Sequence, residues 1–176
     1  MLPLVAVAVA VLLIAPFAYA ATKPDTFRIQ RSTSIQSSPE KIFPLIADFR
    51  SWAAWSPWEK LDPDMKRTHS GPTKGKGAVY EWDGNRKAGA GRMEITESSP
   101  SKLTIKLDFI KPFEGHNVAE FTLEPSGDAT TVTWAMHGPN QYMSKVMTLV
   151  VSMDSLVGKD FEAGLAALKA VAETES

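Results

Sequence analysis

The segment SPEKIFPLIADFRSWAAWSPW, residues 38–58, carries the most structural information in this chain. It opens with the signals of a helix start: a serine, a proline at the first helical position and an acid in the first turn. Apolar residues then recur at helical spacing. Three of the five tryptophans follow at once, at Trp52, Trp55 and Trp58. So much aromatic surface at one junction indicates a packed corner or the wall of an apolar cavity.

Strand patterns lie on both sides of this segment. Residues 26–36 alternate apolar and polar side chains, which predicts a strand before the helix. Turn signals rich in Gly, Pro, Asn and Asp separate the patterns that follow. Further strands are predicted at residues 65–70, 78–82, 89–97, 102–110, 117–123 and 130–136. Each has one apolar and one polar face, which is typical of an antiparallel sheet covered on a single side.

The C-terminal part of the chain has a helical pattern. Residues 142–151 are apolar, and Leu156, Phe161 and Leu165 then recur at helical spacing up to about Val171. This helix is the only predicted element long enough to cover the sheet. We therefore expect an α+β fold in which a curved antiparallel sheet of about seven strands wraps around a long C-terminal helix. Such an arrangement tends to leave a cavity between the two.

The order of elements, together with SSPEKIFPLIADFRSWAAWSPW, resembles the START-like helix-grip superfamily. Within it, the chain is similar to the polyketide cyclase/dehydrase-like branch, also called SRPBCC proteins. The resemblance covers a domain at residues 27–173. It implies a deep apolar pocket between sheet and C-terminal helix that binds hydrophobic or amphipathic small molecules. Some members are cyclases or hydrolases and many only bind or transport, so the resemblance says more about fold than about function.

Aromatic and methionine side chains on the apolar faces are the candidates for the cavity wall. Rings bury large apolar areas, and flexible thioethers adapt to a ligand. Ordinary core packing is the alternative for each of them. The residues predicted to bind the ligand are Trp55, Trp58, Tyr80, Trp82, Met93, Leu107, Phe109, Phe121, Trp134, Met136, Met147 and Phe161.

Composition argues against several other functions. The formal net charge is -1, so the chain lacks the basic field that nucleic-acid binding needs. Cysteine is absent, which excludes disulfides and thiolate chemistry. His69, His116 and His137 do not have the spacing of a metal motif. We expect no metal, no cofactor and no conventional catalytic set.

Three functional hypotheses remain. The favoured one is a non-catalytic module that binds a hydrophobic or amphipathic small molecule, such as a lipid. The second is a cyclase, dehydratase or hydrolase acting in the same cavity, for which His116, His137, Glu94 or Tyr80 would have to point inward. The third is an interaction domain at the membrane surface with a fully packed interior.

The N-terminal segment suggests a membrane. Residues 2–21 contain no charged side chain, and about 20 apolar residues suffice to cross a bilayer. We favour a single-pass anchor at residues 1–21, followed by a linker at residues 22–26, which would make the protein membrane-associated. Alternatively, Ala18-Tyr19-Ala20 is a small-x-small cleavage pattern, as in a secretory signal that is removed on export. The expected partners are thus a hydrophobic small molecule or lipid and the membrane itself.

Overall fold

The computed structural model describes residues 14–140, 145–146, 148–149 and 152–174. Residues 14–21 are helical. The elements that follow are β1 (Thr26–Ile35), α2 (Pro39–Ala47), the 3-10 helices η1 (Phe49–Ala54) and η2 (Pro57–Lys60), β2 (Lys66–Ser70), β3 (Val79–Asp83), β4 (Ala90–Ser99), β5 (Lys102–Lys111), β6 (Gly115–Ser126), β7 (Ala129–Pro139) and α4 (Met153–Thr174).

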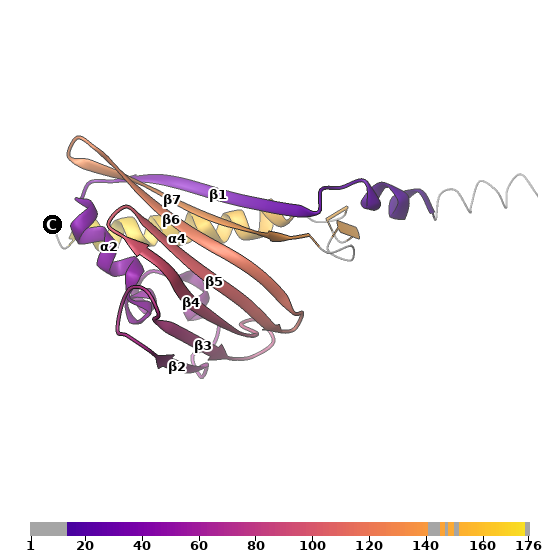
Figure 1. Cartoon of the computed structure of the whole chain (residues 1–176), viewed down its shortest axis with the longest axis horizontal. Helices are drawn as coiled ribbons and strands as arrows, with labels where there is room; N and C mark the ends of the chain where they lie inside the picture. The colour runs from indigo at the N-terminus through magenta and orange to yellow at the C-terminus, as the bar shows by residue number, and fades with distance from the viewer. Residues whose placement is uncertain (1–13, 141–144, 147, 150–151, 175–176) are drawn as a thin grey trace, which may run out of the picture.

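The strands form one antiparallel sheet in the order β1-β7-β6-β5-β4-β3-β2. The sheet curls, and α4 runs along the concave side of its long strands (Figure 1). The predicted α+β helix-grip fold is confirmed. The ends of the strands differ from the prediction by up to three residues; β7, for example, continues to Pro139 rather than ending at Met136. The extension follows from pairing with β1, which joins Thr26 to Pro139.

The core lies between the sheet and α4. Along β5 and β7 inward residues such as Leu103, Ile105 and Val132 are fully buried, and most of the residues between them are partly exposed. The ring of Trp134 lies between Phe121 and Phe161, at centroid distances of 4.8 and 4.3 Å, and is nearly parallel to the second ring. These stacked rings join β6, β7 and α4 into one packed unit.

The tryptophans after α2 complete the end of that helix. The last four carbonyl groups of a helix, here residues 44–47, have no partner within it. The indole N–H groups of Trp52 and Trp55 donate to the two middle carbonyls, each at 2.9 Å. The backbone N–H groups of Asp48 and Gly75 donate to the other two. The same hydrogen bonds therefore cap the C-terminal end of α2 and fix the positions of the two indoles.

An arginine ties α4 to the sheet. Arg31 on β1 donates to both carboxylate oxygens of Asp154, each at 2.9 Å, and to Glu162 at 2.6 Å. Gly158 lies between these acids, and a Cβ there would come within 2.2 Å of the guanidinium. The glycine thus makes room for Arg31 against the first turns of α4.

Replacing Arg31 by glutamine is expected to loosen the start of α4. The neutral amide cannot hold both carboxylates, so the backbone amides of the first two turns should exchange with solvent several-fold faster. The turns around Leu168, which is fully buried, should keep their rates. Hydrogen exchange read by mass spectrometry tests this. Arg28→Gln is the control, because Arg28 pairs with Glu120 on the outer face of the sheet, and equal exchange in both variants would contradict the role of Arg31.

The predicted membrane segment is only partly covered. Its first residues, 1–13, lie outside the described part of the chain, as does most of the helical pattern at residues 142–151. Of the helices in the described part, none combines the length and the apolar character that a membrane crossing requires. The anchor therefore stays a prediction.

Candidate ligand-binding cavity

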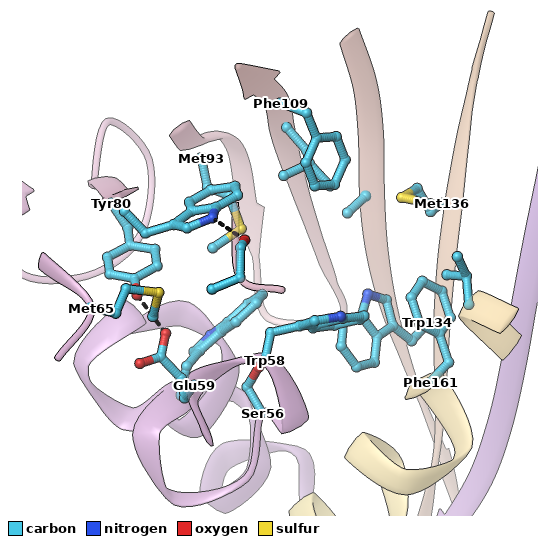
Figure 2. Close-up of a pocket in the computed structure, with 16 residues that line it drawn as sticks. Ser56, Trp58, Glu59, Met65, Tyr80, Met93, Phe109, Trp134, Met136 and Phe161 are labelled. Atoms are coloured by element: carbon cyan, nitrogen blue, oxygen red, sulfur yellow. Dashed lines mark hydrogen bonds between the residues drawn. The ribbon is translucent and has the colours of Figure 1, made fainter. Parts of the chain in front are cut away.

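A cavity of about 290 Å³ lies between the curled sheet, the 3-10 helices and α4. Figure 2 shows Tyr80, Met65 and Glu59 on one side of it and Trp134 with Phe161 on the other. The volume is at the lower end of the range for small-molecule sites, roughly 300–1,000 Å³. From the prediction, the structure places on its wall Trp58, Tyr80, Trp82, Met93, Leu107, Phe109, Trp134, Met136 and Phe161.

Two predicted residues lie elsewhere. Trp55 is in the packed core, because its indole N–H turns toward the carbonyl of Leu45 at the end of α2. Phe121 is fully buried behind Trp134, which covers it on the cavity side. A third predicted residue, Met147, lies outside the described residues.

Several lining residues were not predicted. Small side chains such as Ala88 and Ala119 cannot be recognised as cavity residues from the sequence, because they line the cavity only where larger neighbours leave space. Glu59 is the informative omission, since it directly follows Trp58 in the aromatic segment. Trp52 was named from the sequence only as part of a packed corner or cavity wall and was not among the predicted ligand-binding residues. The other lining residues outside that prediction are Ser56, Glu59, Met65, Ala88, Ala119 and Val157.

A hydrogen-bonded group stands at one end of this apolar wall. The hydroxyl of Tyr80 on β3 donates to Glu59 Oε1 at 2.5 Å, and Arg67 Nε on β2 donates to Glu59 Oε2 at 2.7 Å. The other two guanidinium nitrogens of Arg67 donate to the backbone carbonyls of Met65 and Glu59. Burial raises the pKa of Tyr80, and the hydrogen bond to Glu59 raises it further. Tyr80 is therefore a neutral donor to the carboxylate at physiological pH.

The Trp82 indole forms another part of the wall and is held in place. Its N–H donates to the Ala88 carbonyl at 3.1 Å, and its ring meets Phe109 edge to face. The same ring covers Gly91 on β4, where a Cβ would lie 2.3 Å from the indole. The glycine is thus needed for the ring to lie flat on the sheet.

The groups that an enzyme would need do not converge. His116, His137 and Glu94 have 63%, 39% and 36% of their side-chain surfaces exposed, and each pairs with charged neighbours on the outer face. Of the four groups considered from the sequence, Tyr80 alone reaches the cavity. Within the described ranges, His, Asp and Glu side chains form no group of three that could hold a metal ion.

The ring of His69 packs against that of Tyr80, with centroids 4.9 Å apart and the planes tilted by 34°, and its Nε2 is buried with no hydrogen-bond partner among the described residues. Burial lowers the pKa of His69, and the charge of Arg50 lowers it further. The unfolded chain then binds a proton near pH 6.5 more readily than the folded chain does. Stability should therefore fall as the pH drops below about 6.5.

Replacing His69 by asparagine should flatten this acid-side loss. Urea unfolding at about pH 5 and about pH 7.5, on either side of the ordinary histidine pKa, measures the difference. His116→Asn is the control, with a pH dependence of opposite sign. The Asp108 carboxylate raises the pKa of His116, so the contribution of His116 to stability is lost as the pH rises. A His69 variant with the pH profile of the unaltered protein would show that the imidazole is not held neutral by burial.

The comparisons with known proteins agree with this geometry. The family described as "Polyketide cyclase / dehydrase and lipid transport" matches residues 26–173. The chain belongs to this family, as the resemblance predicted. None of the curated proteins matches the chain significantly.

Solved structures support the same fold. The ginseng major latex-like protein 151 from Panax ginseng superposes with a TM-score of 0.60 at 14% identity, over 84% of this chain and 98% of its own. The Aha1 protein of Colwellia psychrerythraea gives 0.60 at 16% identity, over 84% and 96%. A Mycobacterium smegmatis protein gives 0.60 at 17% identity, over 88% and 96%. At these identities the similarity shows the fold alone.

Proposed function

We propose that the chain binds a hydrophobic or amphipathic small molecule, lipids included, in the cavity between the sheet and α4. The observation that carries the proposal is an interior space of about 290 Å³ lined almost entirely by aromatic, aliphatic and methionine side chains. Burial of apolar ligand surface would supply most of the affinity, at roughly 25 cal/mol per Å². The few polar groups on the wall would set the orientation.

Binding without turnover is the favoured form of this function. Turnover in the cavity would need at least two reactive groups within reach of one ligand atom. Among the groups considered for that role, His116, His137 and Glu94 lie on the outer face. The family description includes cyclases, so a bound molecule that is recovered chemically changed would favour the enzyme instead.

Native mass spectrometry of residues 23–176, which contain the whole region matched by the family, tests the proposal on protein purified from its own host without detergent. We expect a co-purifying small molecule that is lost from a Trp82→Ala variant, because that variant removes a large part of the wall. Met136→Leu is the matched control, since it keeps the volume and apolar character of its site. An empty protein whose tryptophan fluorescence also fails to respond to apolar compounds would contradict the proposal.

We further propose that residues 2–21 hold this binding domain at a membrane. The support is a stretch of uncharged residues long enough to cross a bilayer. Deleting residues 2–21 should move the protein from the membrane fraction to the supernatant. The intact mass of the protein from its host distinguishes the alternative, because a chain that begins at Ala21 would show a cleaved signal.

A further inference from the structure

The polar end of the cavity is built around one carboxylate. Among the described residues on the wall, Glu59 alone carries a charge, and its side chain is only 10% exposed. A carboxylate has about four lone-pair sites on its two oxygens. Tyr80 and Arg67 each donate to one oxygen. Each oxygen therefore keeps the capacity to accept another hydrogen bond.

The two side chains that donate to Glu59 direct their donors at protein atoms. The Tyr80 hydroxyl proton is committed to Glu59, so toward a ligand the phenol oxygen can only accept. The three guanidinium nitrogens of Arg67 bond to the Glu59 carboxylate and to two backbone carbonyls. Glu59 and Tyr80 thus offer only acceptors to a ligand and take a donor from it, while the Ser56 hydroxyl on the same wall can donate or accept.

The charge at this end is balanced. The positive charge of Arg67 lies against Glu59 Oε2 at 2.7 Å, so the pair has no excess negative charge with which to hold a cation. An anionic head group would meet the carboxylate at short range in a poorly screened site, while the neighbouring cation is already engaged. A neutral hydroxyl suits this end of the cavity, because it donates a hydrogen bond and carries no charge.

We infer that the ligand is a small, uncharged apolar molecule carrying a hydroxyl group that donates to Glu59, rather than a fatty-acid anion. This inference rests on the proposed binding function and narrows it. The volume of about 290 Å³ suits a single chain or a small ring system. The hydroxyl lies beside Tyr80 and Glu59, and the apolar body extends toward Trp134 and Phe161.

A set of probes with one ten-carbon chain and different head groups tests the inference. The probes are 1-decanol, decyl methyl ether, decanoate and decylammonium. All are transparent where tryptophan absorbs, and Trp52, Trp58, Trp82 and Trp134 line the cavity, so intrinsic fluorescence of the full chain reports binding. We expect 1-decanol to bind about tenfold more tightly than the ether, a difference equivalent to about 1.4 kcal/mol. Decanoate and decylammonium should both bind more weakly than 1-decanol.

Substitutions then assign the preference to Glu59. Glu59→Gln should reduce the advantage of 1-decanol and raise the affinity for decanoate, because Arg67 loses its carboxylate partner. Tyr80→Phe leaves the carboxylate in place and should keep the preference for the alcohol. Met136→Leu, on an apolar part of the wall, should change the affinities for all four probes by a similar factor. Thermal melts establish that each variant is folded.

The outcomes separate the two proposals. Equal binding of the alcohol and the ether, or tighter binding of either ion, would overturn the hydroxyl inference while preserving the cavity as a binding site. Failure of all four probes to bind would overturn the proposed function as well. If Glu59→Gln does not fold, the order of the probes on the unaltered protein and on Tyr80→Phe still decides the inference.

Discussion

Trp134→Ala is expected to lower the free energy of unfolding by about 3–5 kcal/mol, the range for large aromatic truncations in a core. The ring lies between Phe121 and Phe161 and meets Trp55 and Trp58 edge to face. Its removal leaves a void beside the cavity that surrounding strands cannot close, because both neighbouring strands are held in the sheet. Urea unfolding with an unchanged slope measures the loss.

Trp134→Phe is the matched control. It keeps an aromatic ring between Phe121 and Phe161 and removes an indole nitrogen that has no hydrogen-bond partner in the described part of the chain. It should therefore cost much less than the alanine change. A loss below about 1 kcal/mol for alanine, typical of an average substitution, would show that Trp134 is not the centre of the core.

Gly91→Ala is expected to lower the free energy of unfolding by about 1–3 kcal/mol, as overpacking does, and to abolish ligand binding. The added Cβ would lie 2.3 Å from the Trp82 ring and 2.6 Å from the Asp108 carbonyl oxygen. The carbonyl belongs to the neighbouring strand and cannot retreat, so the indole has to leave the wall. Urea unfolding and the decanol titration measure the two effects.

Gly115→Ala is the control for this substitution. Gly115 also lies in a sheet strand, but a Cβ there would meet only side-chain atoms of Asn117 and Phe109, both at 3.9 Å. Alanine also lowers the conformational entropy of the unfolded chain relative to glycine. This variant should therefore match or slightly exceed the stability of the unaltered protein. Equal stability of the two alanine variants would contradict the close approach of Trp82 to Gly91.

The sequence predicted the architecture because the fold is encoded in repeated local patterns. Period-two alternation, as in residues 102–110, identifies both the strand and its buried face. The β7 end was predicted too early because Gly138 and Pro139 are local breakers, whereas their pairing with β1 is a long-range contact. Local signals cannot report a partner more than a hundred residues away.

The cavity wall was predicted only in part, for a related reason. Alternation places Trp134 and Phe121 on the same inner face of the sheet, but it does not tell which of them faces the empty space. That depends on packing order, which puts Trp134 in front of Phe121. Glu59 was not predicted because an acid in a short polar segment is expected at the surface. Its contacts with Arg67 and Tyr80 arise only in the folded chain.

The hydrogen bond from Trp52 to the Ile46 carbonyl restricts the shapes of ligand that the cavity can accept. A ligand that pushes this indole aside has to uncap α2, so the wall on that side is a fixed template. The methionines at positions 65, 93 and 136 have three rotatable bonds each and lie elsewhere on the wall. Discrimination between ligands by the shape of their apolar bodies should therefore arise at the indole side, and tolerance for variation in that shape at the thioethers.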